Sequence, residues 1–268
     1  MLKKLIITAI LFAGITTTAW SQELENNDIL RIHFVGNSYT YYNNMPQVLY
    51  AFAESRDIRL VTSKTVVGGA ELREHWNNGS EDKPKWSINT REILEKGKYD
   101  IVILQDQSMM PVDYPDSIRV YVRLFTELLK EMGSEPVLYM TWARERIPQL
   151  QDQLTVIYAE AGRTHQIKVA PVGEAFRMAR TLRPGMQLFA DDGTHPSPEG
   201  SYLAACTFFA VITGEDPVGL TRRPKINDQF GESLVLMSLH REDAIFLQTV
   251  ARDVVEVWTN QELKAHAK

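Results

Sequence analysis

The sequence predicts an α/β fold built on a parallel, doubly wound sheet of about five strands. Segments with strand patterning alternate with segments of helical periodicity through most of the chain, and this order is typical of parallel sheets covered by helices. Residues 99–104 contain an unbroken apolar run, as expected for a strand buried on both faces. The length of 268 residues is enough for one large domain with a substantial core.

Strands in the first half of the chain are marked by β-branched and apolar residues at 29–35, 59–67 and 99–104. The first strand ends at Gly36 and the second at Gly68. Apolar residues at helical spacing predict helices at 45–55, 71–76 and 88–95, the last followed by the stop signal Gly97. Residues 77–85 are polar and turn-rich, which predicts a loop.

The second half repeats the alternation. Helix 117–132 has a one-sided apolar stripe and is followed by Gly133. Strand 136–140, helix 149–161, strand 167–172 and helix 173–182 come next, and helix 198–213 begins at a proline and ends at Gly214. A turn-rich stretch then leads to a last helix at about 241–258. The pattern does not decide whether this tail packs on the sheet or forms an interface.

Residues 1–21 have the pattern of a secretory signal peptide, with a basic start, an apolar centre and a small-x-small exit at 19–21. The apolar centre is about 11 residues long, whereas a membrane span needs roughly 20; a retained anchor is the alternative. No cysteine lies near the cleavage point, so we expect no lipid anchor. We expect a secreted or periplasmic protein whose residues 22–268 form a single domain, with a C-terminal extension from about 215.

Composition restricts the partners. The chain has 29 basic and 34 acidic residues, a net charge of −5, and it has no basic stripe, so nucleic acid is not an expected partner. The single cysteine, Cys206, can form no internal disulfide. Its apolar helical context predicts a small buried side chain.

Ser38 is the first residue that could carry chemistry. It follows the first strand and Gly36, and an amphipathic helix begins near Pro46. Ser38 is therefore expected at the carboxyl edge of the sheet, where ligands bind in open α/β folds, beside the free N–H groups of a helix start. A serine in this position can be a helix cap or a nucleophile.

His195 is the second such residue. It lies between a glycine turn and two prolines, in the polar segment 191–200. Asp192 precedes it by three residues, a spacing that lets the carboxylate fold back onto the imidazole. A carboxylate on Nδ1 would leave Nε2 free to act as a base. Asp191 is the alternative to Asp192.

The segments Gly36-Asn37-Ser38-Tyr39-Thr40 and Asp192-Gly193-Thr194-His195-Pro196 together resemble the first and last motifs of the SGNH (GDSL-like) hydrolase superfamily. The resemblance implies a flavodoxin-like three-layer α/β/α sandwich and ester hydrolysis without a cofactor. It implies that Ser38 is the nucleophile, that His195 is the general base and then the general acid, and that Asp192 orients His195. It also implies an oxyanion hole made by the N–H of Ser38, the N–H of Gly69 (with Gly68 as substitute) and an asparagine side chain.

The third motif departs from the superfamily pattern. Gln105-Asp106-Gln107-Ser108 stands where the superfamily has Gly-x-Asn-Asp. Gln105, which directly ends the buried strand, is the first choice for the missing carboxamide donor, and Gln107 is the second. With Gly-Gly-Ala-Glu-Leu and Met-Thr-Trp elsewhere in the chain, this motif is similar to a less-studied SGNH branch of secreted bacterial proteins.

Further residues are candidates for the wall of a pocket, each with a structural alternative. Trp142 follows the fourth strand and could equally be core, and His75 could be a solvated surface residue. Tyr39, Tyr41 and Tyr42 could shape an acyl pocket or only cover a helix end. Asn37, beside Ser38, is a candidate as well.

His33, inside a strand, is expected to be a core histidine. Asp191, Asp192 and His195 form a small cluster, but the chain lacks a zinc-binding pattern, so we expect no metal.

These observations predict a serine esterase that acts on a small-molecule or carbohydrate ester, with O-acetyl groups as one option. Two alternatives stay open. The first is a glycan-binding module that kept the fold and lost the activity because the third motif is altered. The second is a lipase or thioesterase, which would prefer long acyl chains.

Overall fold

The centre of the molecule is a five-stranded sheet, and the computed structural model describes residues 29–79 and 86–266. Its strands are β1 (Leu30–Gly36), β2 (Leu60–Val66), β3 (Ile101–Leu104), β4 (Glu135–Tyr139) and β5 (Lys168–Ala170). All neighbours are parallel and the spatial order is β2-β1-β3-β4-β5. Because the chain moves from β1 to β2 on one side and then to β3 on the other, the carboxyl end of β1 lies at the point where the strand order reverses. Ligands bind at this point in open α/β sheets.

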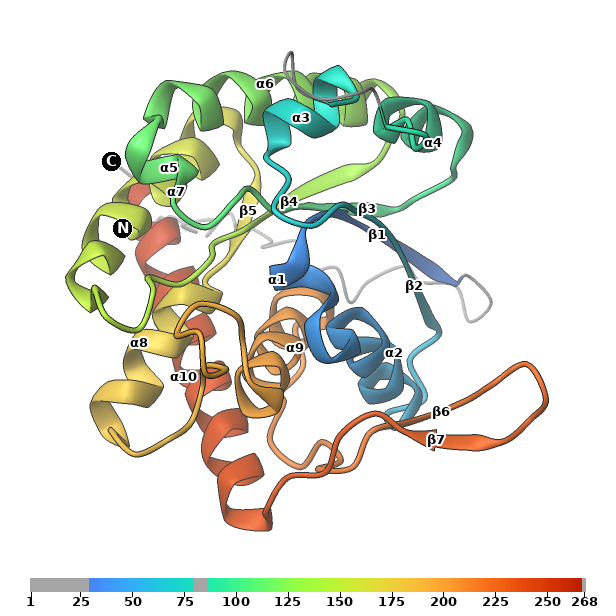
Figure 1. The fold of residues 1–268 in the computed structure, drawn as a ribbon, viewed down its shortest axis with the longest axis vertical. Helices are drawn as coiled ribbons and strands as arrows, with labels where there is room; N and C mark the ends of the chain where they lie inside the picture. Colours follow the sequence, from blue (N-terminus) through green and yellow to red (C-terminus); the bar gives the residue numbers. More distant parts are fainter. Residues whose placement is uncertain (1–28, 80–85, 267–268) are drawn as a thin grey trace, which may run out of the picture.

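Helices cover both faces of the sheet, so the fold is the three-layer α/β/α sandwich that the sequence predicted (Figure 1). The apolar residues of β1 and β3 divide between the faces: Phe34 and Ile103 face one layer, and Val35 and Leu104 the other. One layer contains α2 (Met45–Glu54), α8 (Val172–Leu182), α9 (Pro198–Thr213) and α10 (Arg241–His266). The other contains α3 (Leu72–Asn77), α4 (Thr90–Lys96), α6 (Pro115–Glu131) and α7 (Gln151–His165).

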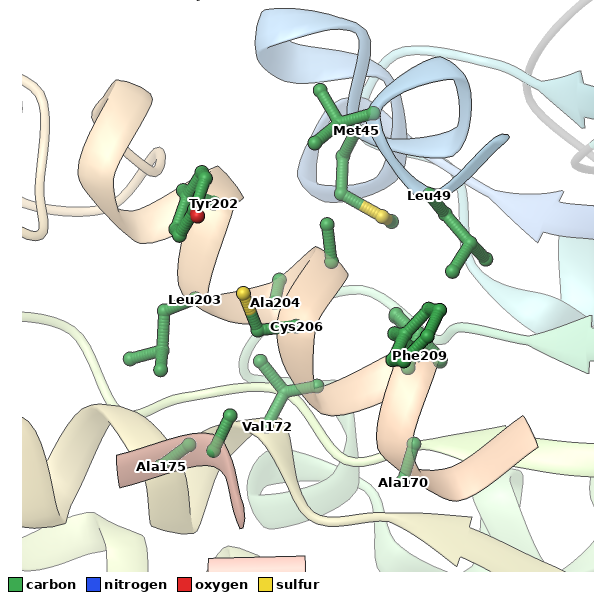
Figure 2. Packing of buried hydrophobic residues seen from close by; sticks show 14 of the residues in the cluster. Met45, Leu49, Ala170, Val172, Ala175, Tyr202, Leu203, Ala204, Cys206 and Phe209 are labelled. Carbon is green, nitrogen blue, oxygen red and sulfur yellow. The ribbon is translucent and has the colours of Figure 1, made fainter. Parts of the chain in front are cut away.

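Helix α9 is buried almost all round, which a surface helix is not. Its residues face Met45 and Leu49 of α2 and Val172 and Ala175 of α8 (Figure 2). The C-terminal helix α10 packs along α9 and α8 and shields α9 from solvent. Cys206, in the middle of α9, has no exposed surface, which confirms the prediction of a buried, unpaired cysteine. The C-terminal segment therefore packs on the helical layer beside the sheet, which the sequence pattern left open.

Several short elements were not predicted. They are α1 (Ser38–Tyr41), the 3-10 helices η1 (Tyr42–Asn44) and η2 (Pro148–Leu150), α5 (Met110–Asp113), and an antiparallel hairpin of β6 (Lys225–Asn227) and β7 (Ser233–Val235). The hairpin projects from the body of the molecule (Figure 1), and its strands are too short to show the alternation that marks a half-buried strand. The expected signal peptide and part of the expected loop at 77–85 lie outside the described residues. Within the described part, no helix is both long and apolar enough to span a membrane.

Candidate active site

Ser38 is held at the end of β1 by the residues that precede it. At Gly36 an added Cβ would lie 2.4 Å from Gln105 Oε1, so only glycine allows this close approach. The N–H of Asn37 donates to the same Gln105 oxygen at 2.8 Å, and Asn37 Oδ1 caps α1 by accepting from the N–H of Tyr39. Asn37 Nδ2 donates to the carbonyl of Ala70. Asn37 is buried and all of its polar groups are used, so it fixes the turn and lines no pocket.

The segment that carries His195 is a small hairpin before α9. The N–H of Ala190 donates to the carbonyl of His195 at 2.8 Å, and that of Ser197 to the carbonyl of Leu188 at 3.0 Å. Gly193 turns the chain with φ +66°, a left-handed conformation that suits glycine. Asn43 Nδ2 donates to the carbonyl of Pro196 at 3.0 Å, so η1 is tied to this hairpin directly beside His195.

The structure brings Ser38 and His195 together although they are 157 residues apart. Ser38 Oγ donates to His195 Nε2 at 2.8 Å, and His195 Nδ1 donates to Asp192 Oδ2 at 2.5 Å. Asp192 Oδ1 accepts from the N–H groups of Thr194 and His195. Of the two neighbouring aspartates, Asp192 is the one that contacts the imidazole.

The charge of Asp192 is favoured by these hydrogen bonds. Partial burial raises its pKa, but the hydrogen bonds from His195 and the backbone, together with attraction to His195, outweigh this and lower the pKa to about 2. The carboxylate therefore stays ionised across the physiological range and fixes the tautomer of His195, with the proton on Nδ1 and the lone pair on Nε2.

Aromatic rings enclose the imidazole of His195. Tyr42 stacks on it with a centroid distance of 4.2 Å and an interplanar angle of 12°, and Tyr39 meets it edge-on at 5.7 Å. The hydroxyl of Tyr39 is hydrogen-bonded to Thr194 Oγ1, and Trp142 Nε1 donates to the carbonyl of Thr194 at 2.9 Å. The residue before His195 is thus held through both its side chain and its backbone.

Trp142 and Tyr39 do not line a pocket together with Ser38; Trp142 borders a separate cavity of about 250 Å³ whose lining includes neither Ser38 nor His195. Trp142 is 1% exposed, stacked between Tyr39 and Phe176, and Tyr39 is also buried. The alternative that Trp142 belongs to the core is therefore confirmed. Both residues hold the hairpin of His195 in place through their hydrogen bonds to Thr194.

Two backbone N–H groups on the turns after β1 and β2 are without a hydrogen-bond acceptor in the described part of the chain. Those of Ser38 and Gly69 donate no hydrogen bond to any residue of the described ranges 29–79 and 86–266. Gly69 is exposed, has φ +69°, and leaves open space where a Cβ would lie. Gly68, the substitute, has Tyr41 Oη near its Cβ position at 3.4 Å. The open surroundings of Gly69 favour it over Gly68.

Gln105 does not suit the role of third oxyanion donor for which it was the first choice. It has no exposed surface. Its Oε1 accepts from the N–H of Asn37 and from Thr40 Oγ1, and its Nε2 donates to the carbonyl of Asp106. Its carboxamide holds the turn at Asn37 through these hydrogen bonds, because the side chain packs directly against Gly36.

Gln107, the second choice, has the free donor that Gln105 lacks. It is half-buried, and its Oε1 accepts from the N–H of Met109 at 3.0 Å. Its Nε2 donates to no residue in the described part of the chain.

Asp106, between the two glutamines, is buried and accepts from the N–H groups of Leu72 and Gln107. Burial raises its pKa to about 6, although these two hydrogen bonds oppose the rise.

His75 is neither a pocket residue nor a solvated surface residue, and both expectations were wrong. It has no exposed surface; its Nε2 donates to the carbonyl of Gly36 at 2.8 Å, and its Nδ1 accepts from Thr90 Oγ1 at 2.8 Å. Desolvation lowers its pKa to about 4, against the opposing effects of Gly36 and Glu74. His33 is a core histidine as predicted, bonded to Ser63 and Thr65. His75 therefore holds the end of β1, and His33 links β1 to β2.

Sequence reasoning left several contributors unassigned. Tyr42 was noted only as one of three neighbouring tyrosines, and Asn43 and Thr194 were not singled out. The positions of Asn43 and Thr194 beside the two motifs were a usable signal, but the stacking of Tyr42 depends on tertiary contacts. In the described residues, no group of three or more His, Cys, Asp or Glu side chains could hold a metal ion.

A Ser–His–Asp hydrogen-bond chain at the carboxyl edge of a parallel α/β/α sandwich is an arrangement that serine hydrolases use, and it recurs on several unrelated folds. No family model matches the sequence, and no curated protein matches it. Among solved structures, a protein of Slackia heliotrinireducens described as a proposed SGNH hydrolase is 29% identical, with a TM-score of 0.56 over 69% of this chain and 100% of that one.

Two further structures share the fold. A DUF4886 family protein of Bacteroides uniformis has a TM-score of 0.66 and 20% identity, and covers 85% of this chain and 95% of its own. The esterase EstA of a Pseudoalteromonas species has a TM-score of 0.53 and 9% identity, over 69% and 97%. These similarities support the SGNH hydrolase superfamily, and they support a hydrolase as the general class of this chain.

Proposed function

We propose that the chain is a serine esterase that works through an acyl-enzyme on Ser38. Ser38 Oγ attacks the ester carbonyl while its proton passes to His195 Nε2. The tetrahedral intermediate collapses, and His195 returns this proton to the departing alkoxide, which leaves as the alcohol. A water molecule then attacks the acyl-enzyme, His195 takes its proton, and the same proton restores Ser38 as the carboxylic acid is released.

The observation that carries this proposal is the hydrogen-bond chain from Ser38 Oγ through His195 to Asp192, at 2.8 and 2.5 Å. The 2.8 Å between Ser38 and His195 is a separation that a serine nucleophile and its base require, and the base is in turn oriented by a third group. A serine that only capped α1 would need no imidazole, and Asn37 already provides the cap.

The negative charge that develops on the carbonyl oxygen would be met by the N–H groups of Ser38 and Gly69. Gln107 Nε2 is the third donor in this proposal, because the carboxamide of Gln105 is buried and occupied. One such donor is worth about 3 kcal/mol in the transition state. The altered third motif would therefore preserve a carboxamide, carried by a side chain one carbon longer.

The proposed substrate class is a small or carbohydrate ester, and the proposed location is secreted or periplasmic. The pattern of residues 1–21 supports the location. The described residues contain no feature that favours the glycan-binding module or the lipase over the esterase, so those alternatives are outcomes of the test.

The test compares wild type, Ser38→Ala and Ser87→Ala on para-nitrophenyl acetate. Ser87 is an exposed serine and serves as a matched control. We expect S38A to lose at least about a thousand-fold in kcat, whereas S87A keeps its activity. A fluorophosphonate probe should label wild type at Ser38 and leave S38A unlabelled. Folded S38A with wild-type activity would refute the proposal, and glycan binding without labelling would favour the binding module.

A further inference from the structure

Arg144 lies between the two loops that frame the candidate site. It follows β4 at the carboxyl edge of the sheet. Its Nη2 donates to Ser108 Oγ at 3.2 Å, and Ser108 belongs to the loop after β3 and is 3% exposed. The N–H of the next residue, Glu145, donates to the carbonyl of Gly193 at 2.9 Å, two residues before His195. The backbone at Arg144 is therefore anchored to the hairpin that carries His195.

The guanidinium also lies close to the aromatic floor of the site. Burial raises the pKa of the Tyr39 phenol, and Arg144 and a hydrogen bond to Ser108 are among the effects that oppose this rise. Tyr39 in turn contacts both Thr194 and the edge of His195. The contacts thus run from Arg144 through Ser108 and Tyr39 to the catalytic imidazole.

Arg144 has no carboxylate partner in the described part of the chain. Other arginines, such as Arg123 and Arg177, form ion pairs on the surface. Arg144 is half-buried, and its Nε is buried without a hydrogen-bond partner. A buried donor that loses its water without gaining an acceptor costs free energy, and such groups are few in folded proteins.

Two acidic residues of the neighbouring loops, Asp192 and Asp106, are already engaged. Asp192 accepts from His195 and from two backbone N–H groups. Asp106 accepts from the N–H groups of Leu72 and Gln107. Neither carboxylate can turn to Arg144 without giving up these bonds. Asp191 and Glu145, the exposed acidic residues nearby, form no ion pair with Arg144, so no carboxylate in the described part of the chain neutralises its charge.

We propose that Arg144 binds a carboxylate of the substrate, and that the enzyme prefers esters that carry this negative charge near the scissile bond. A guanidinium offers parallel N–H donors that match the two oxygens of a carboxylate. This inference rests on the proposed esterase function and adds a substrate class to it. Arg144 would act in binding, whereas the chemistry remains with Ser38 and His195.

The experiment uses two pairs of esters, each with an acid and its neutral methyl ester. In the first pair, the acid is the mono-para-nitrophenyl ester of succinate, which carries the charge on the acyl side of the scissile ester. In the second pair, the acid is O-acetyl-3-hydroxybenzoate, which carries the charge on the leaving group. Wild type is compared with Arg144→Gln and with Arg146→Gln. Arg146 lies in the same loop and is exposed, so R146Q makes the same change of charge outside the proposed contact.

In at least one pair, we expect wild type to prefer the acid, and R144Q to lower kcat/KM for the acid by about 10- to 100-fold, as for the loss of a charge-assisted hydrogen bond. The neutral ester should change by no more than about threefold, the scatter expected of a group that does not touch it. R146Q should behave as wild type. The pair that responds identifies the side of the ester that carries the charge.

The inference is overturned if R144Q lowers activity equally on acids and neutral esters, because Arg144 would then only support the loops. It is also overturned if R144Q changes neither. Failure of the esterase proposal is a separate result, since it would appear as full activity of S38A on all four esters. An inactive S38A with an unselective R144Q would refute the carboxylate site alone.

Discussion

The imidazole of His195 is restrained on three sides. Asp192 holds Nδ1, the ring of Tyr42 covers one face at 4.2 Å, and Tyr39 meets the ring edge-on. In the proposed mechanism His195 becomes an imidazolium, and a cation is attracted to the face of an aromatic ring. Tyr42 is therefore placed to stabilise the charged form of His195 and to keep its ring aligned with Ser38 Oγ.

Replacement of Tyr42 by leucine should affect both rate and pH dependence. We expect Tyr42→Leu to lower kcat up to about tenfold and to move the acid limb of the kcat/KM profile to lower pH by about half a unit, because a cation–π contact of 0.5–1 kcal/mol is lost. Tyr42→Phe keeps the ring and should match wild type in both. The measurement is a pH–rate profile on para-nitrophenyl acetate.

Two results would contradict this role of the Tyr42 ring. Equal losses in Y42F and Y42L would show that the hydroxyl matters and the ring does not. A Y42L profile that falls in rate with an unchanged acid limb would assign Tyr42 to packing alone.

Gln107 offers a second test at the level of a single residue. Gln107→Glu keeps the acceptor for the N–H of Met109 but replaces the amide donor by a carboxylate. We expect kcat to fall at least about 100-fold with little change in KM, since an oxyanion donor acts mainly in the transition state. Kinetics on para-nitrophenyl acetate, with thermal unfolding to check the fold, measures this. Wild-type kcat in Q107E would exclude Gln107 as the third donor.

At the level of elements, local patterns were sufficient where a segment is regular. Helix α9 was predicted at residues 198–213 and is found there, because its ends carry proline and glycine signals. The five strands were placed within a few residues, since each is a segment rich in apolar or β-branched residues between turn residues. The hairpin of β6 and β7 and the short helix α1 were not found, because three or four residues show no period.

The third motif shows what element-level reasoning could not supply. Gln105 was the first choice over Gln107 because of its position at the end of the buried strand, and only the packing against Gly36 shows that Gln105 is buried and occupied. The same holds for His75, which lies on a short helix that gave no sign of contact with β1. Roles set by contacts between distant segments need the tertiary structure.

Across the whole molecule, the carboxyl edge of the sheet gathers segments that are far apart in the chain. The turn after β1, the loops after β2, β3 and β4, and the hairpin before α9 meet there. Their mutual hydrogen bonds depend on the intact sheet, so conditions that loosen the packing around β1 should also impair the site.

Acid is such a condition, because two buried histidines fasten β1. Desolvation lowers the pKa of His33 and of His75 to about 4, from an ordinary value of 6.5. The unfolded chain therefore binds protons between pH 6.5 and 4 that the folded chain does not, and this part of the stability is lost as pH falls through that range. Asp106 acts in the opposite direction, since its pKa is raised to about 6 and its folded form takes up a proton first. The two histidines outweigh the one aspartate.

Replacement of His75 by glutamine should make the protein less sensitive to acid. Glutamine can still donate to the carbonyl of Gly36 and accept from Thr90, but it does not titrate. Between pH 7 and 4.5 we expect wild type to lose about 2 to 3 kcal/mol more free energy of unfolding than His75→Gln. Urea unfolding at the two pH values measures the difference, and His240→Gln, at an exposed histidine, should follow wild type. An equal loss in H75Q and wild type would show that His75 is not the group whose protonation weakens the end of β1.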